Sequence, residues 1–282
     1  GDDCVVDCID CDYKNIQCET GYSCAINCQS CDSVTITAES VTNLELNCNQ
    51  TCYGSIVTAS LSSIDSQFTL NCNAPINPST SGRNGCRNLD VTVDHIESVY
   101  TSTTATSNYP VVITCDGEEA CSGIYVDSTV RGNFNAQCSG ERACGWSNFV
   151  YNPPRNTGQM DVACLGANNS ACYAMNVVSV STRQINLVCG DATSVSEAYN
   201  SPCFHLDILG PVFPFDLDET DFSWDTMYND SVVVECNEYQ CQSMDIHVPF
   251  GKHQAQVNDY VYDWDQTSSV DYTCGYDFAS AG

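Results

Sequence analysis

The chain has 282 residues, of which 36 are Asp or Glu and only 8 are Lys or Arg, so its formal net charge is −28. Binding to nucleic acid phosphates requires charge of the opposite sign, which excludes nucleic acid as an expected partner. The 22 cysteines, an even number spread over the whole length, predict a disulfide framework in an oxidising, extracellular compartment. No apolar run is long enough to cross a bilayer, so we expect no membrane span.

One sequence unit recurs along the chain. Two alternating apolar residues lead into a cysteine, a variable loop follows, and a second cysteine opens another alternating pair. The clearest copies lie at 111–126 and 134–149. Alternation with a period of two places these side chains on one face of a strand. The unit is therefore a strand, a turn flanked by cysteines, and a second strand.

Nine complete copies and a tenth half copy at Val270, Tyr272 and Cys274 fit this pattern. Early copies begin about 20 residues apart, which suits one coil of a parallel β-helix, where each strand pairs with its equivalent in the next coil. We expect an all-β, single-domain solenoid of about ten coils over residues 1–282. Lys14, Ser55 and Ser147 are exceptions, because they stand where the pattern expects an apolar residue.

Three long insertions follow the second strand of their copies, at 94–110, 209–231 and 249–268. Because they occupy the same position in their copies, we expect all three to emerge from one edge of the solenoid. Loops gathered on one edge are where repeat proteins bind ligands. Their aromatic residues suit glycans or a neighbouring subunit, or they cover the end of the core. A carboxylate cluster in the second insertion suits Ca²⁺, with a solvated acidic loop as the alternative and no other cofactor expected. The cluster comprises Asp216, Asp218, Glu219 and Asp221.

We expect the two cysteines of each copy to pair across their turn. The predicted disulfides are Cys8–Cys11, Cys28–Cys31, Cys48–Cys52, Cys72–Cys86, Cys115–Cys121, Cys138–Cys144, Cys164–Cys172, Cys189–Cys203 and Cys236–Cys241. Pairing between coils is the alternative, because strands stack about 4.8 Å apart. The two-residue gaps of the first two pairs are also typical of zinc sites, but the longer gaps of the other copies are not.

Four cysteines remain outside this scheme: Cys4, Cys18, Cys24 and Cys274. Cys18 and Cys24 are close enough in sequence to close a turn, while Cys4 and Cys24 hold equivalent places in successive copies and are the alternative pair. We expect the C-terminal half copy of one subunit to dock on the first coil of the next, locked by a disulfide from Cys274 to Cys4 or Cys18. A free thiol, or a bond within one subunit, is the competing expectation.

Secretion is also indicated by three N-glycosylation sequons, at Asn49, Asn168 and Asn229, and by the start GDDC, which we interpret as a processed N-terminus. Catalysis is not expected, so we predict that the protein is not an enzyme. Basic residues are scarce and scattered, and no nucleophile elbow, phosphate loop or dinucleotide fingerprint is present.

The pattern C-x-G-x-x-A-C, at Cys115–Cys121 and Cys138–Cys144, resembles the cysteine-rich parallel β-helix repeats in large extracellular proteins of algae and other protists, some associated with flagellar hairs (mastigonemes) and surface fibres. The close match covers about a third of the chain, and the long aromatic insertions depart from it. The resemblance implies a glycosylated structural subunit of an extracellular filament. Polymerisation head to tail is our expected function, a carbohydrate-binding module is the alternative, and a polysaccharide lyase or hydrolase is the third.

Overall fold

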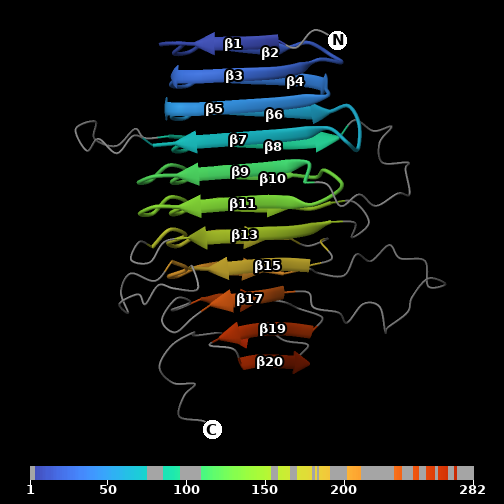
Figure 1. Cartoon of the computed structure of the whole chain (residues 1–282), viewed down its shortest axis with the longest axis vertical. Coiled ribbons are helices and arrows are strands. Elements are labelled where there is room, and N and C mark those ends of the chain that lie inside the picture. The colour runs from blue at the N-terminus through green and yellow to red at the C-terminus, as the bar shows by residue number, and fades with distance from the viewer. Residues whose placement is uncertain are drawn as a thin grey trace, which may run out of the picture.

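The computed structural model describes residues 4–74, 85–95, 109–153, 158–165, 170–179, 182, 184–190, 202–210, 232–236, 244–247, 252–257, 260–265 and 270–271. Within these ranges the chain forms strands and no helix. The strands build an 11-stranded and a 10-stranded sheet, and successive strands alternate between the two sheets as far as residue 257. Figure 1 shows the resulting stack, with the N-terminus at one end. The predicted parallel β-solenoid is therefore confirmed.

The first sheet contains the strands that precede the cysteine turns, followed at its end by two strands without a cysteine. In spatial order they are β1 (Cys4–Cys8), β3 (Ser23–Ser30), β5 (Asn43–Thr51), β7 (Gln67–Asn73), β9 (Val111–Asp116), β11 (Phe134–Ser139), β13 (Gln159–Leu165), β15 (Gln184–Cys189), β17 (Val232–Cys236), β19 (Lys252–Val257) and β20 (Tyr260–Asp265). The second sheet contains the strands after the turns: β2 (Asn15–Cys18), β4 (Thr35–Val41), β6 (Ile56–Leu61), β8 (Asp90–His95), β10 (Tyr125–Ser128), β12 (Asn148–Tyr151), β14 (Asn176–Val178), β16 (Asp207–Leu209), β18 (Asp245–His247) and β21 (Val270–Asp271).

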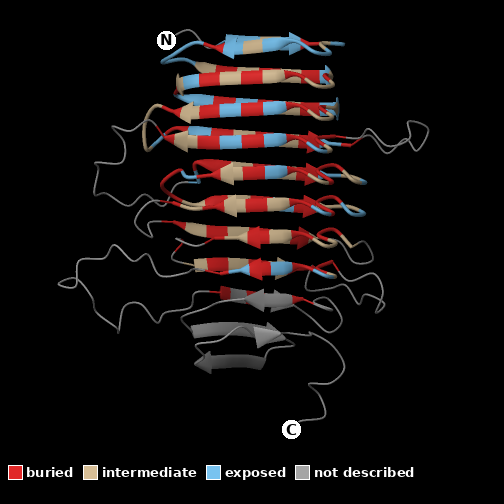
Figure 2. Cartoon of the chain, turned by 180° about the vertical axis from the view of Figure 1, so that it is seen from behind, coloured by how far each residue is buried: buried red, intermediate tan, exposed pale blue. Residues whose placement is uncertain are grey.

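The register of the first sheet aligns equivalent residues of successive copies. Cys8 lies opposite Cys28, Cys28 opposite Cys48, and Cys48 opposite Cys72, and the series continues to Cys236. A slip of one residue would turn every apolar side chain out of the core, so the buried face fixes this register. Figure 2 shows the alternation of buried and more exposed positions along the strands of the middle coils.

Regular stacking ends before a tenth coil, so the predicted count of about ten coils is wrong. β20 runs antiparallel to β19, and β21 runs antiparallel to β18. Val270, predicted to begin a tenth first-sheet strand, lies in the second sheet instead, while Tyr272 and Cys274 lie outside the described residues. The first sheet is extended by β19 and β20, which belong to the segment 249–268 that we predicted as an insertion. Strand pairing satisfies backbone groups without any cysteine, and the cysteine pattern therefore missed these strands.

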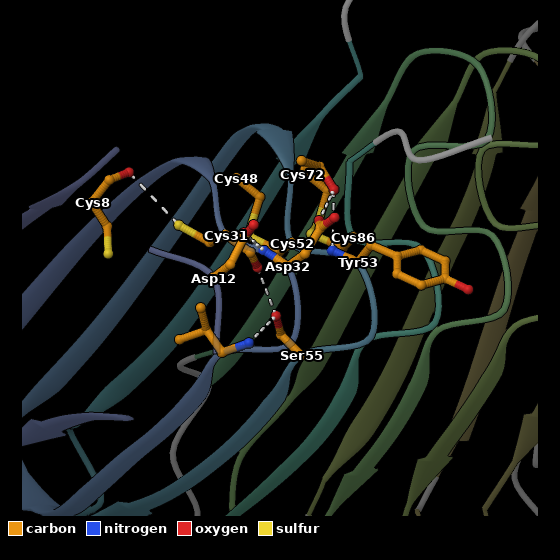
Figure 3. Close-up of a disulfide and its surroundings, with 12 residues drawn as sticks. Cys8, Asp12, Cys31, Asp32, Cys48, Cys52, Tyr53, Ser55, Cys72 and Cys86 are labelled. Atoms are coloured by element: carbon orange, nitrogen blue, oxygen red, sulfur yellow. Dashed lines mark hydrogen bonds between the residues drawn. A yellow bond between two sulfur atoms is a disulfide. The ribbon is translucent and has the colours of Figure 1, made fainter. Parts of the chain in front are cut away.

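The three exceptions to the apolar pattern have separate explanations. Lys14 is exposed, because the first coil is covered by protein on one side only among the described residues. Ser55 is buried; its hydroxyl accepts a hydrogen bond from the Val34 N–H (3.0 Å) and donates one to the Cys31 carbonyl (2.9 Å) (Figure 3). Ser147 is also buried and donates to the Cys121 carbonyl at 2.7 Å. Buried hydroxyls are tolerated when they are satisfied in this way.

We expect Ser55→Ala to lower the free energy of unfolding by about 1–3 kcal/mol, because the buried Val34 N–H loses its hydroxyl acceptor. Ser147→Ala removes only a donated bond, and the Cys121 carbonyl keeps its bond from the Ile124 N–H at 3.0 Å. It should cost less, about 0.5–1.5 kcal/mol. Denaturation under non-reducing conditions measures the free energy of unfolding of both variants. A larger loss in Ser147→Ala than in Ser55→Ala would contradict the hydrogen-bond roles assigned to the two hydroxyls.

Candidate functional site along the disulfide edge and the first sheet

Disulfides close the turns between the two sheets. Seven of the nine predicted pairs are bonded, at Cys8–Cys11, Cys48–Cys52, Cys72–Cys86, Cys115–Cys121, Cys138–Cys144, Cys164–Cys172 and Cys189–Cys203. Cys18 bonds to Cys24, which removes both the vertical Cys4–Cys24 alternative and Cys18 as a link between subunits. Cys4 is a free, exposed thiol. The side chains of Cys236, Cys241 and Cys274 lie outside the described residues.

The predicted Cys28–Cys31 disulfide is absent from the structure, where both residues are buried free thiols. The two-residue gap is not the reason, because Cys8 and Cys11 bond across the same gap. The Cys31 sulfur instead lies 3.7 Å from the Cys8 carbonyl oxygen of the neighbouring coil, to which its thiol donates.

The residue two positions after the second cysteine of each described turn has a left-handed backbone conformation. These residues, with φ between 50° and 69°, are Tyr13, Ser33, Gly54, Asn88, Gly123, Trp146, Ala174 and His205. The N–H groups of the first seven donate to carbonyl oxygens of the next coil, as that of Trp146 does to the Tyr173 carbonyl at 2.8 Å, so the turns stack as the strands do. We did not predict this position, because only three of the eight residues are the glycine or asparagine that a left-handed conformation favours.

An aromatic row lies on this turn edge. The Trp146 and Tyr173 rings meet edge to face at 5.2 Å between centroids, and Phe204 stacks on Tyr173 at 5.9 Å. The Arg142 guanidinium lies 5.8 Å from the Trp146 ring, and His205 contacts Phe204 at 4.1 Å. We predicted aromatic ligand surfaces on the three insertions, whereas this row arises from turn positions whose spacing is visible only after the copies are aligned.

A second candidate surface lies on the outer face of the first sheet around Tyr109, the residue before the last of the predicted insertion at 94–110. The Tyr109 hydroxyl donates to the Asp161 carboxylate at 2.9 Å, and this hydrogen bond raises the pKa of the Tyr109 phenol. Gln67 donates to the Tyr109 carbonyl at 2.9 Å, and Asn186 donates to Asp161 at 2.7 Å. Shallow hollows lie on either side of this bridge, and Asn135 lines both. The surface combines amides, a carboxylate and one aromatic ring, 38% exposed, which suits polar ligands such as sugars.

Burial also acts on a histidine, His95, which lies at the end of β8. Burial disfavours the charged imidazolium and lowers the pKa of His95 to about 4, although the Ser63 carbonyl and Asp94 act in the opposite direction. The backbone N–H of Arg131 donates to His95 Nδ1 at 3.1 Å, so this nitrogen is an acceptor in the neutral ring. The group is part of the packed interior rather than of an open cleft.

Acidification should therefore destabilise the fold through His95. The folded pKa lies below the unfolded value of about 6.5, so the unfolded chain binds more protons between these values. The stabilisation is fully present above about pH 6.5 and is lost as the pH falls toward 4. Denaturation at several pH values should show a smaller loss in His95→Gln than in the natural chain, because carboxylate titration is common to both. Parallel losses would show that His95 is not responsible.

The remaining predicted sites are described only in part. Asn49 is exposed in β5, close to the Cys48–Cys52 bridge, and is accessible for glycosylation. Asn168, Asn229 and the carboxylate cluster at 216–221 lie outside the described residues. The described part of the chain has no helix long and apolar enough to cross a membrane.

Comparison with known proteins returns no match for this chain among protein-family models, curated proteins or solved structures.

Proposed function

We propose that the protein is a structural subunit of an extracellular filament or surface fibre and that it polymerises head to tail. The observation that carries this proposal is the incomplete burial of the first coil. Cys4 is exposed and Val6 is half-buried, whereas Cys24 and Ile26, their equivalents in the next coil, are 3% and 0% exposed. In Figure 2 this coil is mostly pale blue, whereas red, buried positions alternate with tan and pale blue ones in the coils that follow it.

The same coil exposes three large apolar side chains. Val5, Ile9 and Tyr13 are 62%, 67% and 81% exposed. Among the described strands β1 has a neighbour on one side only, β3, so its outer backbone groups are free to pair with a further strand. A coil of a second copy matches this surface in strand spacing and in the pattern of inward side chains.

An amide ladder runs to this edge on the outer face of the first sheet. Asn71 donates to Asn47 at 2.8 Å, Asn47 to Asn27 at 3.0 Å, and Asn27 to the Asp7 carboxylate at 2.8 Å. Each amide keeps one coil in register with the next, and Asp7 leaves acceptor capacity at the outer end. A second copy that donates to Asp7 would extend the ladder across the junction.

A contact between unlike ends does not close on itself and therefore propagates as a fibre. The charge of −28 opposes association of copies, so salt should promote assembly by screening this repulsion. The eight disulfides in the described part of the chain and an exposed Asn49 support the extracellular, glycosylated part of the proposal, as does the resemblance to mastigoneme-type repeats. The free thiol of Cys4 is the proposed covalent link at the junction, with Cys274 of the next copy as its partner.

Sedimentation and negative-stain electron microscopy at increasing salt test this proposal. We expect filaments of the natural chain and loss of filaments in the double variant Ile9→Lys, Tyr13→Lys. Ile56→Lys is the matched control, because Ile56 is 49% exposed in β6, away from the first coil. A natural chain that stays monomeric at high concentration and salt would refute polymerisation. Filaments that dissociate to monomers on non-reducing gels would refute only the disulfide link.

A carbohydrate-binding function is the second candidate, and the polar surface around Tyr109 and Asp161 favours it. A glycan array that compares the natural chain with Tyr109→Ala tests it, because this variant lacks both the hydroxyl and the aromatic ring of Tyr109. Saturable binding that the variant loses would support this function. Release of reducing sugars or unsaturated products from the bound glycans would point to the lyase or hydrolase alternative instead.

A further inference from the structure

Two C-x-x-C segments of successive coils lie one above the other at the N-terminal end of the solenoid. Cys8 and Cys28 are register partners in β1 and β3. Cys8 is bonded to Cys11, whereas Cys28 and Cys31 are free thiols. The sulfur atoms of Cys8, Cys11 and Cys31 all lie within 4.8 Å of one another. Figure 3 shows the Cys31 side chain directed toward Cys8, with the 3.7 Å contact to its carbonyl oxygen.

Closeness of sulfur atoms is not special to this place. The trios Cys72, Cys115 and Cys121, and Cys115, Cys138 and Cys144, are equally compact, because the strand register stacks the cysteine columns. Every member of those two trios is bonded in a disulfide. Among the described cysteines, the N-terminal group alone combines a disulfide with a free thiol, Cys31, at this range. A thiol beside a disulfide is the arrangement that exchange requires.

We propose that Cys8, Cys11, Cys28 and Cys31 form one thiol–disulfide exchange unit, in which a single disulfide moves between two adjacent coils. In the first step the Cys31 thiolate attacks Cys11 Sγ, the Cys31–Cys11 bond forms, the Cys8–Cys11 bond breaks, and Cys8 leaves as a thiolate. In the second step the Cys28 thiolate attacks Cys31 Sγ, which forms Cys28–Cys31 and releases Cys11. Two protons pass from Cys28 and Cys31 to Cys8 and Cys11, and no external oxidant is consumed.

The electrostatics of the dithiol match these roles. The Cys28 thiol donates to the Cys31 sulfur, which lowers the pKa of Cys31 and raises that of Cys28. Backbone groups of Cys11 and Ser30 further lower the pKa of Cys31, against the opposing effect of burial. The thiolate is the attacking species in exchange, so Cys31 is the nucleophile and Cys28 the resolving cysteine.

Exchange moves the pair of free thiols from the second coil to the first. Cys28 and Cys31 are 1% and 0% exposed, whereas Cys11 is partly exposed in the first coil. Moving the disulfide inward therefore delivers a reactive dithiol to the outer coil. Its substrate class is an external disulfide, either a small molecule such as oxidised glutathione or a disulfide of another protein. This inference does not depend on the proposed polymerisation.

Acid quenching, N-ethylmaleimide labelling under denaturing conditions and non-reducing peptide mapping of the full chain test the proposal. Two populations are expected. In one, Cys8 and Cys11 are bonded and Cys28 and Cys31 are labelled; in the other, Cys28 and Cys31 are bonded and Cys8 and Cys11 are labelled. Two oxidised pairs without label in this region would overturn the proposal in favour of static disulfides. Stoichiometric zinc with four labelled cysteines would overturn it in favour of a metal site.

Two variants make the test sharper. Cys28→Ser removes the resolving thiol, so the mixed disulfide Cys11–Cys31 should become the major species. Cys31→Ser removes the nucleophile, so Cys8–Cys11 should be the sole disulfide among these residues. The Cys138–Cys144 bridge is the internal control for folding and must stay unlabelled in each variant. With that bridge intact, absence of the mixed species in Cys28→Ser would refute exchange.

Discussion

Phe134→Ala is expected to lower the free energy of unfolding by about 3–5 kcal/mol, the usual cost of truncating a buried phenylalanine. Phe134 is fully buried in β11, and its ring lies 5.4 Å from the Tyr151 ring and 5.9 Å from the Phe149 ring, centroid to centroid. The neighbouring coils place Val111 and Met160 beside it. These strands are held by their own ladders and cannot collapse into the space that the ring leaves.

Phe134→Leu is the matched control, because it keeps most of the apolar volume and should cost less than about 1.5 kcal/mol. Solenoid coils interact with their nearest neighbours, so hydrogen exchange should accelerate mainly in β9, β11 and β13. Denaturation under non-reducing conditions gives the overall loss, and hydrogen exchange gives its location. Equal losses in the two variants would show that the cost comes from removing the aromatic ring itself, and would contradict the assignment of the loss to unfilled volume.

The coil and its register were predictable from sequence because one physical constraint is repeated in every copy. Inward side chains alternate with outward ones, and a cysteine ends the alternating run before the turn. Cys8, Cys28 and Cys48 therefore reveal both the strand phase and the pairing partner. The within-copy disulfides followed from the same columns, because a short loop brings its two ends together.

Features that depend on contacts between coils were not predictable in this way. The bridge from Tyr109 to Asp161 joins residues 52 apart in sequence, and no local pattern connects them. The Cys28 and Cys31 thiols have the same spacing as the bonded Cys8 and Cys11, so the spacing alone does not decide whether a pair is bonded. β19 and β20 were missed because they carry no cysteine, on which the sequence pattern depends, and pair only through their backbone groups.

Gly140→Ala is the second large effect that we expect, a loss of about 2–4 kcal/mol from backbone strain together with a steric clash. Gly140 has a φ of 113°, and a Cβ atom there would lie 2.7 Å from the Gly117 carbonyl oxygen. Gly117 has a φ of 109°, and its own Cβ would lie 2.7 Å from the Ala74 carbonyl oxygen. Both obstacles are backbone carbonyl oxygens. The Gly117 backbone is held by its N–H bond to the Ser139 carbonyl at 2.8 Å, and the Ala74 backbone by its N–H bond to the Asp116 carbonyl at 2.9 Å. The glycine of the C-x-G-x-x-A-C pattern therefore serves close stacking of coils.

Two other glycines separate strain from clash. Gly21 has a φ of 85°, but a Cβ there would meet nothing within 4 Å, so Gly21→Ala should cost about 1 kcal/mol from strain alone. Gly54 has a φ of 60° and its nearest atom would be 3.8 Å away, and Trp146 and Ala174 hold the equivalent position in other coils, so Gly54→Ala should cost no more. Denaturation of the three variants under non-reducing conditions should give Gly140→Ala a clearly lower free energy of unfolding than the other two. If all three lose the same stability, the backbone conformation alone selects glycine, and the close stacking of turns does not.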